Sequence, residues 1–151
     1  MKPLIVLLAI FFVSIFLIKL ITKKYDLPLA GQIAMCAMLI FTSIGHFMFG
    51  QGMAMMIPTI IPYRIEIVYL TGIFEILLGI CLLIPGLRVY SAWILILFFL
   101  LVLPANIYAA INHVDYQKGT FDGNGLAYLW FRVPLQIVFI LWTYLSSIKI
   151  W

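Results

Sequence analysis

Four polar or ionisable side chains of this sequence lie inside or at the end of long apolar runs. Glu75 lies near the middle of the run YLTGIFEILLGICLLIP, and His46 lies near the end of another apolar run. Asn106 lies in LPANIYAAINH and Arg132 in AYLWFRVPLQIVFILW. A carboxyl and an imidazole are common partners in general acid–base chemistry. An ionisable residue at the centre of a bilayer costs about 2.5–3.5 kcal/mol on insertion scales, so such residues are normally paired or functional.

Glu75 has small residues on its own helical face. Gly72 and Gly79 stand at i−3 and i+4, and Thr71 lies beside them. Small residues on a membrane helix allow another helix or a ligand to approach closely. Two interpretations follow: a functional carboxyl, or a protonated carboxyl that only hydrogen-bonds a neighbouring helix.

Arg132 shares a helical face with Gln136, one turn further along the chain. If the apolar span begins near Gly125, Arg132 lies roughly 10 Å below the membrane boundary at 1.5 Å per residue. If the span begins near Leu135, Arg132 is instead an interfacial anchor whose charge reaches the head-group region. Pro134 fits either start, as a first-turn residue or as a kink.

The candidate residues fall at related depths in the predicted helices. His46 shares a face with Thr42 and Ser43, and Asn106 follows a kink expected at Pro104. By helix rise His46, Asn106 and Arg132 lie roughly 24–27 Å from the cytoplasmic end, with Glu75 about two turns deeper and within reach of Arg132. This layer predicts a polar pocket that opens toward the outer leaflet. Each residue could alternatively be a hydrogen-bonded packing residue, His46 in particular.

The composition predicts that these residues are positioned by membrane-spanning helices. The chain has 151 residues, of which 66% are hydrophobic and 9% charged, whereas soluble domains carry roughly 25% charged residues. We expect an all-α, polytopic helix bundle in the lipid bilayer, with an N-terminal transmembrane helix within residues 1–24 and a four-helix bundle over residues 28–151. Apolar runs long enough to span cover residues 3–21, 28–49, 65–84, 89–112 and 125–148.

The basic residues predict the orientation of the spans. The net charge is +4, but Lys and Arg sit at the ends of apolar runs rather than in a stripe, so no nucleic-acid partner is expected. Cytoplasmic loops carry more Lys and Arg, which favours N-terminus out and C-terminus in. The first run is interpreted as a retained helix, because it lacks an A-x-A cleavage pattern. The residues predicted to face the cytoplasm are Lys19, Lys23, Lys24, Arg88 and Lys149.

The segment 50–63, GQGMAMMIPTIIPY, is a connection without any charge. Pro58 and Pro62 prevent a continuous helix there. A segment this apolar is expected to lie at the membrane interface or to re-enter the membrane. We therefore predict that it covers the outer mouth of the bundle as a lid.

Several motifs resemble the DoxX-like family of small bacterial membrane proteins. They are GHF (45–47), IPTIIP (57–62), YLTGIFEILLGICLLIP (69–85), PANIYAA (104–110) and RVPLQ (132–136). The resemblance covers roughly residues 30–148 and implies a four-helix membrane bundle in a bacterial inner membrane. It also implies that the family's polar positions are His46, Glu75, Asn106, Arg132 and Gln136.

The resemblance further suggests a membrane redox partner protein, because DoxX proteins were named for quinol- or thiosulfate-linked electron transfer. It identifies no cofactor. A quinone suits an intramembrane pocket, whereas haem ligation would need His46 and His113, which the sequence places at different depths. No metal-ligating cluster is evident in the sequence.

Three classes of function remain open on the sequence. The first is a binding module that holds a small lipophilic or quinone-like molecule with Arg132, Asn106, Gln136, Glu75 and His46. The second is a membrane enzyme in which Glu75 and His46 act as proton donor and acceptor; without a nucleophile motif or nucleotide loop, its reaction stays unassigned. The third is a non-catalytic assembly partner of another membrane protein.

Overall fold

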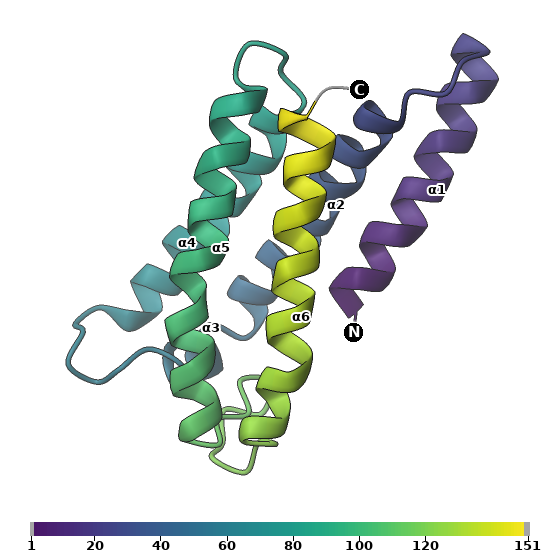
Figure 1. Ribbon diagram of the computed structural model, residues 1–151. Helices are drawn as coiled ribbons and strands as arrows, with labels where there is room; N and C mark the ends of the chain where they lie inside the picture. The colour runs from purple at the N-terminus through teal and green to yellow at the C-terminus, as the bar shows by residue number, and fades with distance from the viewer. Residues whose placement is uncertain (1, 150–151) are drawn as a thin grey trace.

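The computed structural model describes residues 2–149 and has five helices that are long and apolar enough to cross a membrane (Figure 1). The five predicted spans are confirmed, each within about two residues of its expected bounds. A short helix α3 follows α2, and α6 continues into a π-helical turn. The bounds are α1 Lys2–Thr22, α2 Leu27–Met48, α3 Gly50–Ala54, α4 Arg64–Leu82, α5 Arg88–Ile111, α6 Leu126–Thr143 and η1 Tyr144–Ile148.

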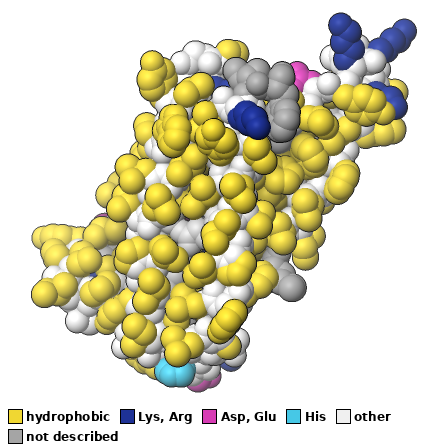
Figure 2. Space-filling view, in the orientation of Figure 1, with side chains coloured by type: hydrophobic (Ala, Val, Ile, Leu, Met, Phe, Trp, Pro, Cys, Tyr) yellow, Lys and Arg dark blue, Asp and Glu magenta, His cyan; other side chains and the backbone are white. Residues whose placement is uncertain are grey.

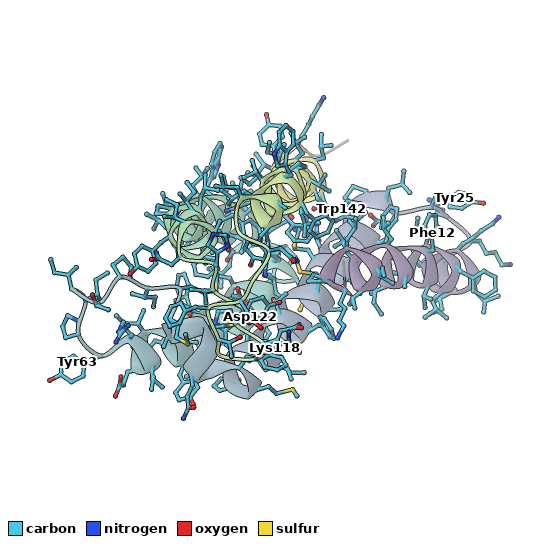
Figure 3. The ribbon with its side chains drawn as sticks, turned by 90° about the horizontal axis from the view of Figure 1, so that it is seen from below. Phe12, Tyr25, Tyr63, Lys118, Asp122 and Trp142 are labelled. Atoms are coloured by element: carbon cyan, nitrogen blue, oxygen red, sulfur yellow. The ribbon has the colours of Figure 1, made fainter. Side chains whose placement is uncertain are left out.

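Helices α2, α4, α5 and α6 run side by side, whereas α1 lies at one side of them and leans away (Figure 1). Helix α1 packs mainly on α2. It also reaches α6, because the ring of Phe11 meets that of Trp142 edge-on at 4.8 Å between centroids. From the end that holds α3, Trp142 can be seen on the side of α6 that faces α1 (Figure 3).

The surface of the bundle is largely apolar. Hydrophobic side chains cover most of the visible face, and basic side chains gather where α1 ends (Figure 2). Large apolar residues are exposed on the long helices, Trp130 by 85%. A soluble protein rarely exposes a contiguous apolar surface of this extent, so lipid is the solvent for it. The protein is a multi-pass membrane protein with an all-α bundle.

Local chemistry explains where the helices begin. The Asp26 carboxylate caps α2 by accepting a hydrogen bond from the Leu29 amide at 2.9 Å. Helix α6 begins directly after Gly125, whose φ of +57° suits glycine and whose Cα lies against the ring of His113. The helix itself begins at Leu126 rather than near Leu135, so Pro134 is interior to the helix.

The apolar core lies mostly away from α3. Its buried members come from all five long helices, and they include Leu7, Met35, Met38, Leu82, Leu95 and Phe139. A smaller cluster of Met56, Ala109 and Val114 lies under the connections at the α3 end. Apolar side chains therefore fill most of the bundle, and the connecting segments cover it at the end that holds α3.

The segment 50–63 only partly forms the expected lid. Gly50 and Gly52 of α3 lie against the Tyr69 ring and the Tyr116 backbone, so α3 is packed on the bundle. The rest of the segment extends sideways, with Ile60 exposed by 89%. Tyr63 accordingly lies at the periphery in Figure 3. The end of the bundle that holds α3 and residues 112–125 is called the α3 end below.

Candidate functional site

Glu75 and His46 meet between α4 and α2. His46 Nε2 lies 3.5 Å from Glu75 Oε1, and the two side chains are 16% and 8% exposed. The second carboxyl oxygen, Oε2, lies 2.9 Å from the hydroxyl of Thr42, one turn before His46. An acid and a base predicted from the sequence are therefore in contact inside the membrane-spanning part of the chain.

The partners of His46 Nδ1 fix which ring nitrogen carries the proton. Nδ1 lies 3.0 Å from the Val68 carbonyl and 3.1 Å from the Thr71 hydroxyl. That hydroxyl donates its own proton to the same carbonyl at 2.7 Å. A carbonyl can only accept, so Nδ1 is the donor. Nε2 is left to accept a proton from Glu75 or, in the imidazolium, to donate one to it.

Thr42 gives the carboxyl a second polar contact. Its oxygen lies 3.0 Å from the Leu39 carbonyl and 2.9 Å from Glu75 Oε2, and a hydroxyl has only one proton to donate. When Leu39 accepts that proton, Glu75 Oε2 must donate one to satisfy the contact. The cluster can therefore hold Glu75 either as a carboxylate or as an acid.

The pair forms because α2 and α4 approach closely. Gly72 faces His46 without a side chain, and a Cβ there would lie 2.9 Å from the His46 Cβ. The Ser43 hydroxyl donates to the Gly72 carbonyl at 2.7 Å. Gly79, two turns further along the same face of α4, lies against Cys36. The small residues around Glu75 therefore pack against another helix, the first of the two roles that their spacing suggested.

Arg132 lies apart from this pair. Its guanidinium Cζ is 5.0 Å from the centre of the Tyr128 ring and 5.6 Å from that of Tyr116. Within residues 2–149 no carboxylate lies within 4 Å of it. The sequence placed Glu75 within reach of Arg132, but the two residues form no salt bridge. Glu75 is paired with His46 instead.

Asn106 and Gln136 are buried between α5 and α6. The Gln136 side-chain amide donates to the Phe99 carbonyl. Asn106 is 3% exposed. Three buried polar atoms of this region have no hydrogen-bond partner among the described residues: Asn106 Oδ1, Gln136 Oε1 and the Tyr128 hydroxyl oxygen. Buried polar groups are normally satisfied.

Ring contacts place these residues at two levels. The rings of Phe74 and Phe98 lie 5.9 Å apart, and Gln136 bonds to the next residue, Phe99. Glu75, which follows Phe74, is therefore level with Gln136. Helix rise puts Arg132 about 6 Å closer to the α3 end and Asn106 about 10 Å closer. The structure thus joins His46 to Glu75 and leaves Arg132 nearer the loops.

The loop 112–125 closes the α3 end and supplies Tyr116. Asp115 accepts hydrogen bonds from the amides of Gln117 and Lys118, and Lys118 pairs with Asp115 and Asp122. A hydrogen bond from the Thr120 hydroxyl lowers the pKa of Asp122. Figure 3 shows Lys118 and Asp122 in front of the bundle when it is viewed from this end.

Sequence reasoning missed both tyrosines that flank Arg132. Tyr128 stands one helical turn before Arg132, a spacing that signals side-chain contact. Tyr116 comes from the loop, where no periodicity reports its position. His113 lies beyond the end of α5 with φ +52° and packs on Gly125.

Two surface clefts lie at the α3 end. One, of about 300 Å³, is lined by α3, Tyr69 and residues 116–119. The other, of about 540 Å³, lies between α3 and residues 59–66. Neither cleft is lined by Glu75, His46 or Arg132. The buried polar groups therefore do not form the walls of either cleft.

Comparison with known proteins gives one family. Residues 35–147 match the family model described as "Domain of unknown function (DUF8561)". No curated protein and no solved structure matches the chain. The matched region begins inside α2 and ends inside η1, so it contains His46, Glu75, Asn106, Arg132 and Gln136. The chain belongs to the DUF8561 family.

Proposed function

We propose that this protein binds the polar head group of a small lipophilic molecule between α5, α6 and the Glu75–His46 pair. The observation that carries the proposal is the set of buried, unpartnered polar atoms on Asn106, Gln136 and Tyr128. An unsatisfied buried group costs about 1–3 kcal/mol. In the bilayer core, water is not freely available to satisfy such groups, and a ligand with hydrogen-bonding atoms would do so.

The Glu75–His46 pair gives the proposed ligand a proton donor and acceptor at the level of Gln136. A quinone-like ring is one head group that would use both properties. The hydroxyls of its reduced form can donate to the amide oxygens of Asn106 and Gln136, its oxidised form accepts a hydrogen bond from the Tyr128 hydroxyl, and its reduction takes up protons. The DoxX-like motifs support the same class of ligand, together with a membrane redox partner protein. We further propose a bacterial inner-membrane location with the N-terminus outside, which would place the α3 end toward the exterior.

The test is to identify what co-purifies with the protein. Protein extracted in a neutral detergent is delipidated by exchange, and bound molecules are measured by native mass spectrometry and by organic extraction. One lipophilic molecule per chain is expected. Gln136→Leu should lower its occupancy, because it removes the amide oxygen that the ligand satisfies.

Gln32→Leu is the matched control. Gln32 is equally deep in the protein, also lacks a partner for its side-chain oxygen, and donates its amide to the Ser146 carbonyl at 2.7 Å. It lies in the first part of α2, at the opposite end of the bundle from α3. An empty protein, or equal loss of ligand in both variants, would contradict the proposed site.

A membrane enzyme is the second candidate, and the geometry of the Glu75–His46 pair favours it. A carboxyl and an imidazole 3.5 Å apart could pass a proton to or from a bound substrate. Glu75→Gln keeps the hydrogen bond to Thr42 and removes the titratable proton. If this variant retains ligand but loses turnover of it, catalysis is supported; unchanged turnover excludes Glu75 as the acid or base.

A further inference from the structure

Arg132 is a membrane-helix cation without a counter-ion among the described residues. It stands six positions after the first residue of α6, which is roughly 9 Å by helix rise. The contacts of its guanidinium are the rings of Tyr116 and Tyr128, at 5.6 and 5.0 Å. Cation–π contacts compensate a charge only in part, by about 0.5–2 kcal/mol. An anion would complete the compensation.

The two rings leave the hydrogen-bonding edge of the guanidinium available. A guanidinium is planar and directs five N–H donors outward in its own plane. Rings that lie over the group do not accept those in-plane bonds. The Tyr128 hydroxyl is a polar neighbour of the guanidinium, but no carboxylate among residues 2–149 lies within 4 Å of it, so most of its donors are left for a ligand. A carboxylate or phosphate matches this free edge with two parallel bonds.

Neighbouring groups add one donor and one acceptor to this site. The Tyr128 ring that lies on Arg132 carries a buried hydroxyl, which has no partner among the described residues other than the guanidinium beside it. Asn106, at the same end of the bundle on α5, has a buried side-chain oxygen that can accept a hydrogen bond from the O–H of a singly protonated phosphate. One hydroxyl and one guanidinium edge suit an oxyanion better than the neutral carbonyl of a quinone, because the charge of Arg132 is then neutralised.

We infer that the ligand is an amphiphile with an oxyanion head, a phosphate or carboxylate, which binds the free edge of Arg132 and the Tyr128 hydroxyl. This inference rests on the proposed function and narrows its ligand class. Tyr116 and Tyr128 hold the guanidinium in one orientation, so its free edge is preformed. The acyl or isoprenoid tail lies among the apolar helices or in the surrounding lipid.

The experiment measures binding of defined probes to full-length protein in a neutral detergent, by titration followed by native mass spectrometry. The probes are dodecyl phosphate, a benzoquinone with a decyl tail, and inorganic phosphate alone. Dodecyl phosphate should bind once per chain. Its affinity should fall at least about tenfold in Arg132→Gln, as expected for loss of a charge-assisted bidentate contact.

Three variants separate this contact from general effects. Arg64→Gln removes the arginine at the first residue of α4 and should leave binding unchanged. Tyr128→Phe keeps the ring and removes only the hydroxyl, so a smaller loss of a few-fold is expected. Arg132→Lys keeps the charge without the planar fork and should rank between wild type and Arg132→Gln.

The outcomes distinguish this inference from the proposal it rests on. Tight binding of the neutral quinone that survives Arg132→Gln, with weak binding of dodecyl phosphate, overturns the oxyanion head alone. Inorganic phosphate binding as tightly as dodecyl phosphate shows a free-oxyanion site and overturns the amphiphile. If none of the three probes binds, the inference fails, and the co-purification measurement on Gln136 decides separately whether the proposed function fails with it.

Discussion

At the scale of single residues, the polar chemistry divides into two groups with different partners. Glu75 shares its contacts with His46 and Thr42, and every polar atom of that group has an acceptor or donor nearby. Hydrogen-bonding groups without a full set of partners remain on four other residues, Arg132, Tyr128, Asn106 and Gln136. The first group is a closed hydrogen-bonded cluster, and the second contains the groups that we propose bind the ligand.

Replacing Glu75 separates the hydrogen-bonding role from the charge. Glu75→Leu should lower the free energy of unfolding by about 1–3 kcal/mol, because the hydroxyl of Thr42 and Nε2 of His46 lose their buried partner. Glu75→Gln should cost much less, since an amide can bond to both. Chemical denaturation in mixed micelles measures the difference. Equal losses in the two variants would show that hydrogen bonding at this position does not stabilise the fold.

Residue-level predictions succeeded where helical spacing determined the answer. The face shared by Glu75, Gly72 and Gly79 was readable from the sequence, and it does pack closely on α2. The direct contact of Glu75 with His46 was not, because counting residues gives the depth of a backbone position and not the direction of a side chain. The rings on Arg132 were missed for a related reason, since Tyr116 belongs to an irregular loop.

At the scale of elements, the site depends on how closely α2 and α4 approach and on how α3 packs against the loop 112–125. Glycines mark both contacts. Gly72 meets His46 and Ser43 on α2, and Gly52 of α3 meets the backbone of Tyr116. Gly86, in the connection between α4 and α5, has no neighbouring atom within 4 Å of where a Cβ would be.

Gly72→Ala should separate α2 from α4. The added methyl would lie 2.9 Å from the His46 Cβ, which is backbone-proximal and cannot rotate away. Overpacking of this kind costs about 1–3 kcal/mol. Gly86→Ala is the control and should leave stability nearly unchanged. Thermal unfolding of both variants gives the comparison, and equal melting temperatures would contradict the close helix contact.

Gly52→Ala should release α3 from the loop that carries Tyr116. A Cβ at this position would overlap the Tyr116 carbonyl oxygen, so one of the two segments must move. We expect faster amide hydrogen exchange over residues 113–124, measured by mass spectrometry, with little change in α5. Gly86→Ala again serves as control. Unchanged exchange in the Gly52 variant would mean that α3 does not hold the loop.

At the scale of the whole molecule, apolar runs and charge placement determine the architecture. All five spans were predictable because each is an uninterrupted apolar run of membrane length. The lid was only half predictable: Pro58 and Pro62 end the helical structure, but the direction of the chain beyond α3 depends on contacts with distant residues. The sideways course of residues 57–63 has no signal in the local sequence.

The proposed orientation makes a prediction for the whole chain. With the N-terminus outside, a cysteine introduced by Lys118→Cys should react with a membrane-impermeant maleimide in intact cells. Lys24→Cys, between α1 and α2, should react only after the membrane is opened. Both lysines are exposed, so accessibility does not differ in the isolated protein. The reverse pattern would show that the α3 end faces the cytoplasm.

The central claim is that α5 and α6, together with the Glu75–His46 pair, hold a lipophilic ligand by its head group. The most direct measurement is an experimental density map of the protein purified with its native lipids. We predict elongated density whose polar end meets the Tyr128 hydroxyl and Asn106 Oδ1 near the α3 end, and which extends along α5 and α6 to a polar atom at Gln136 Oε1. A well-resolved map in which protein side chains or isolated waters satisfy those three atoms would contradict the account.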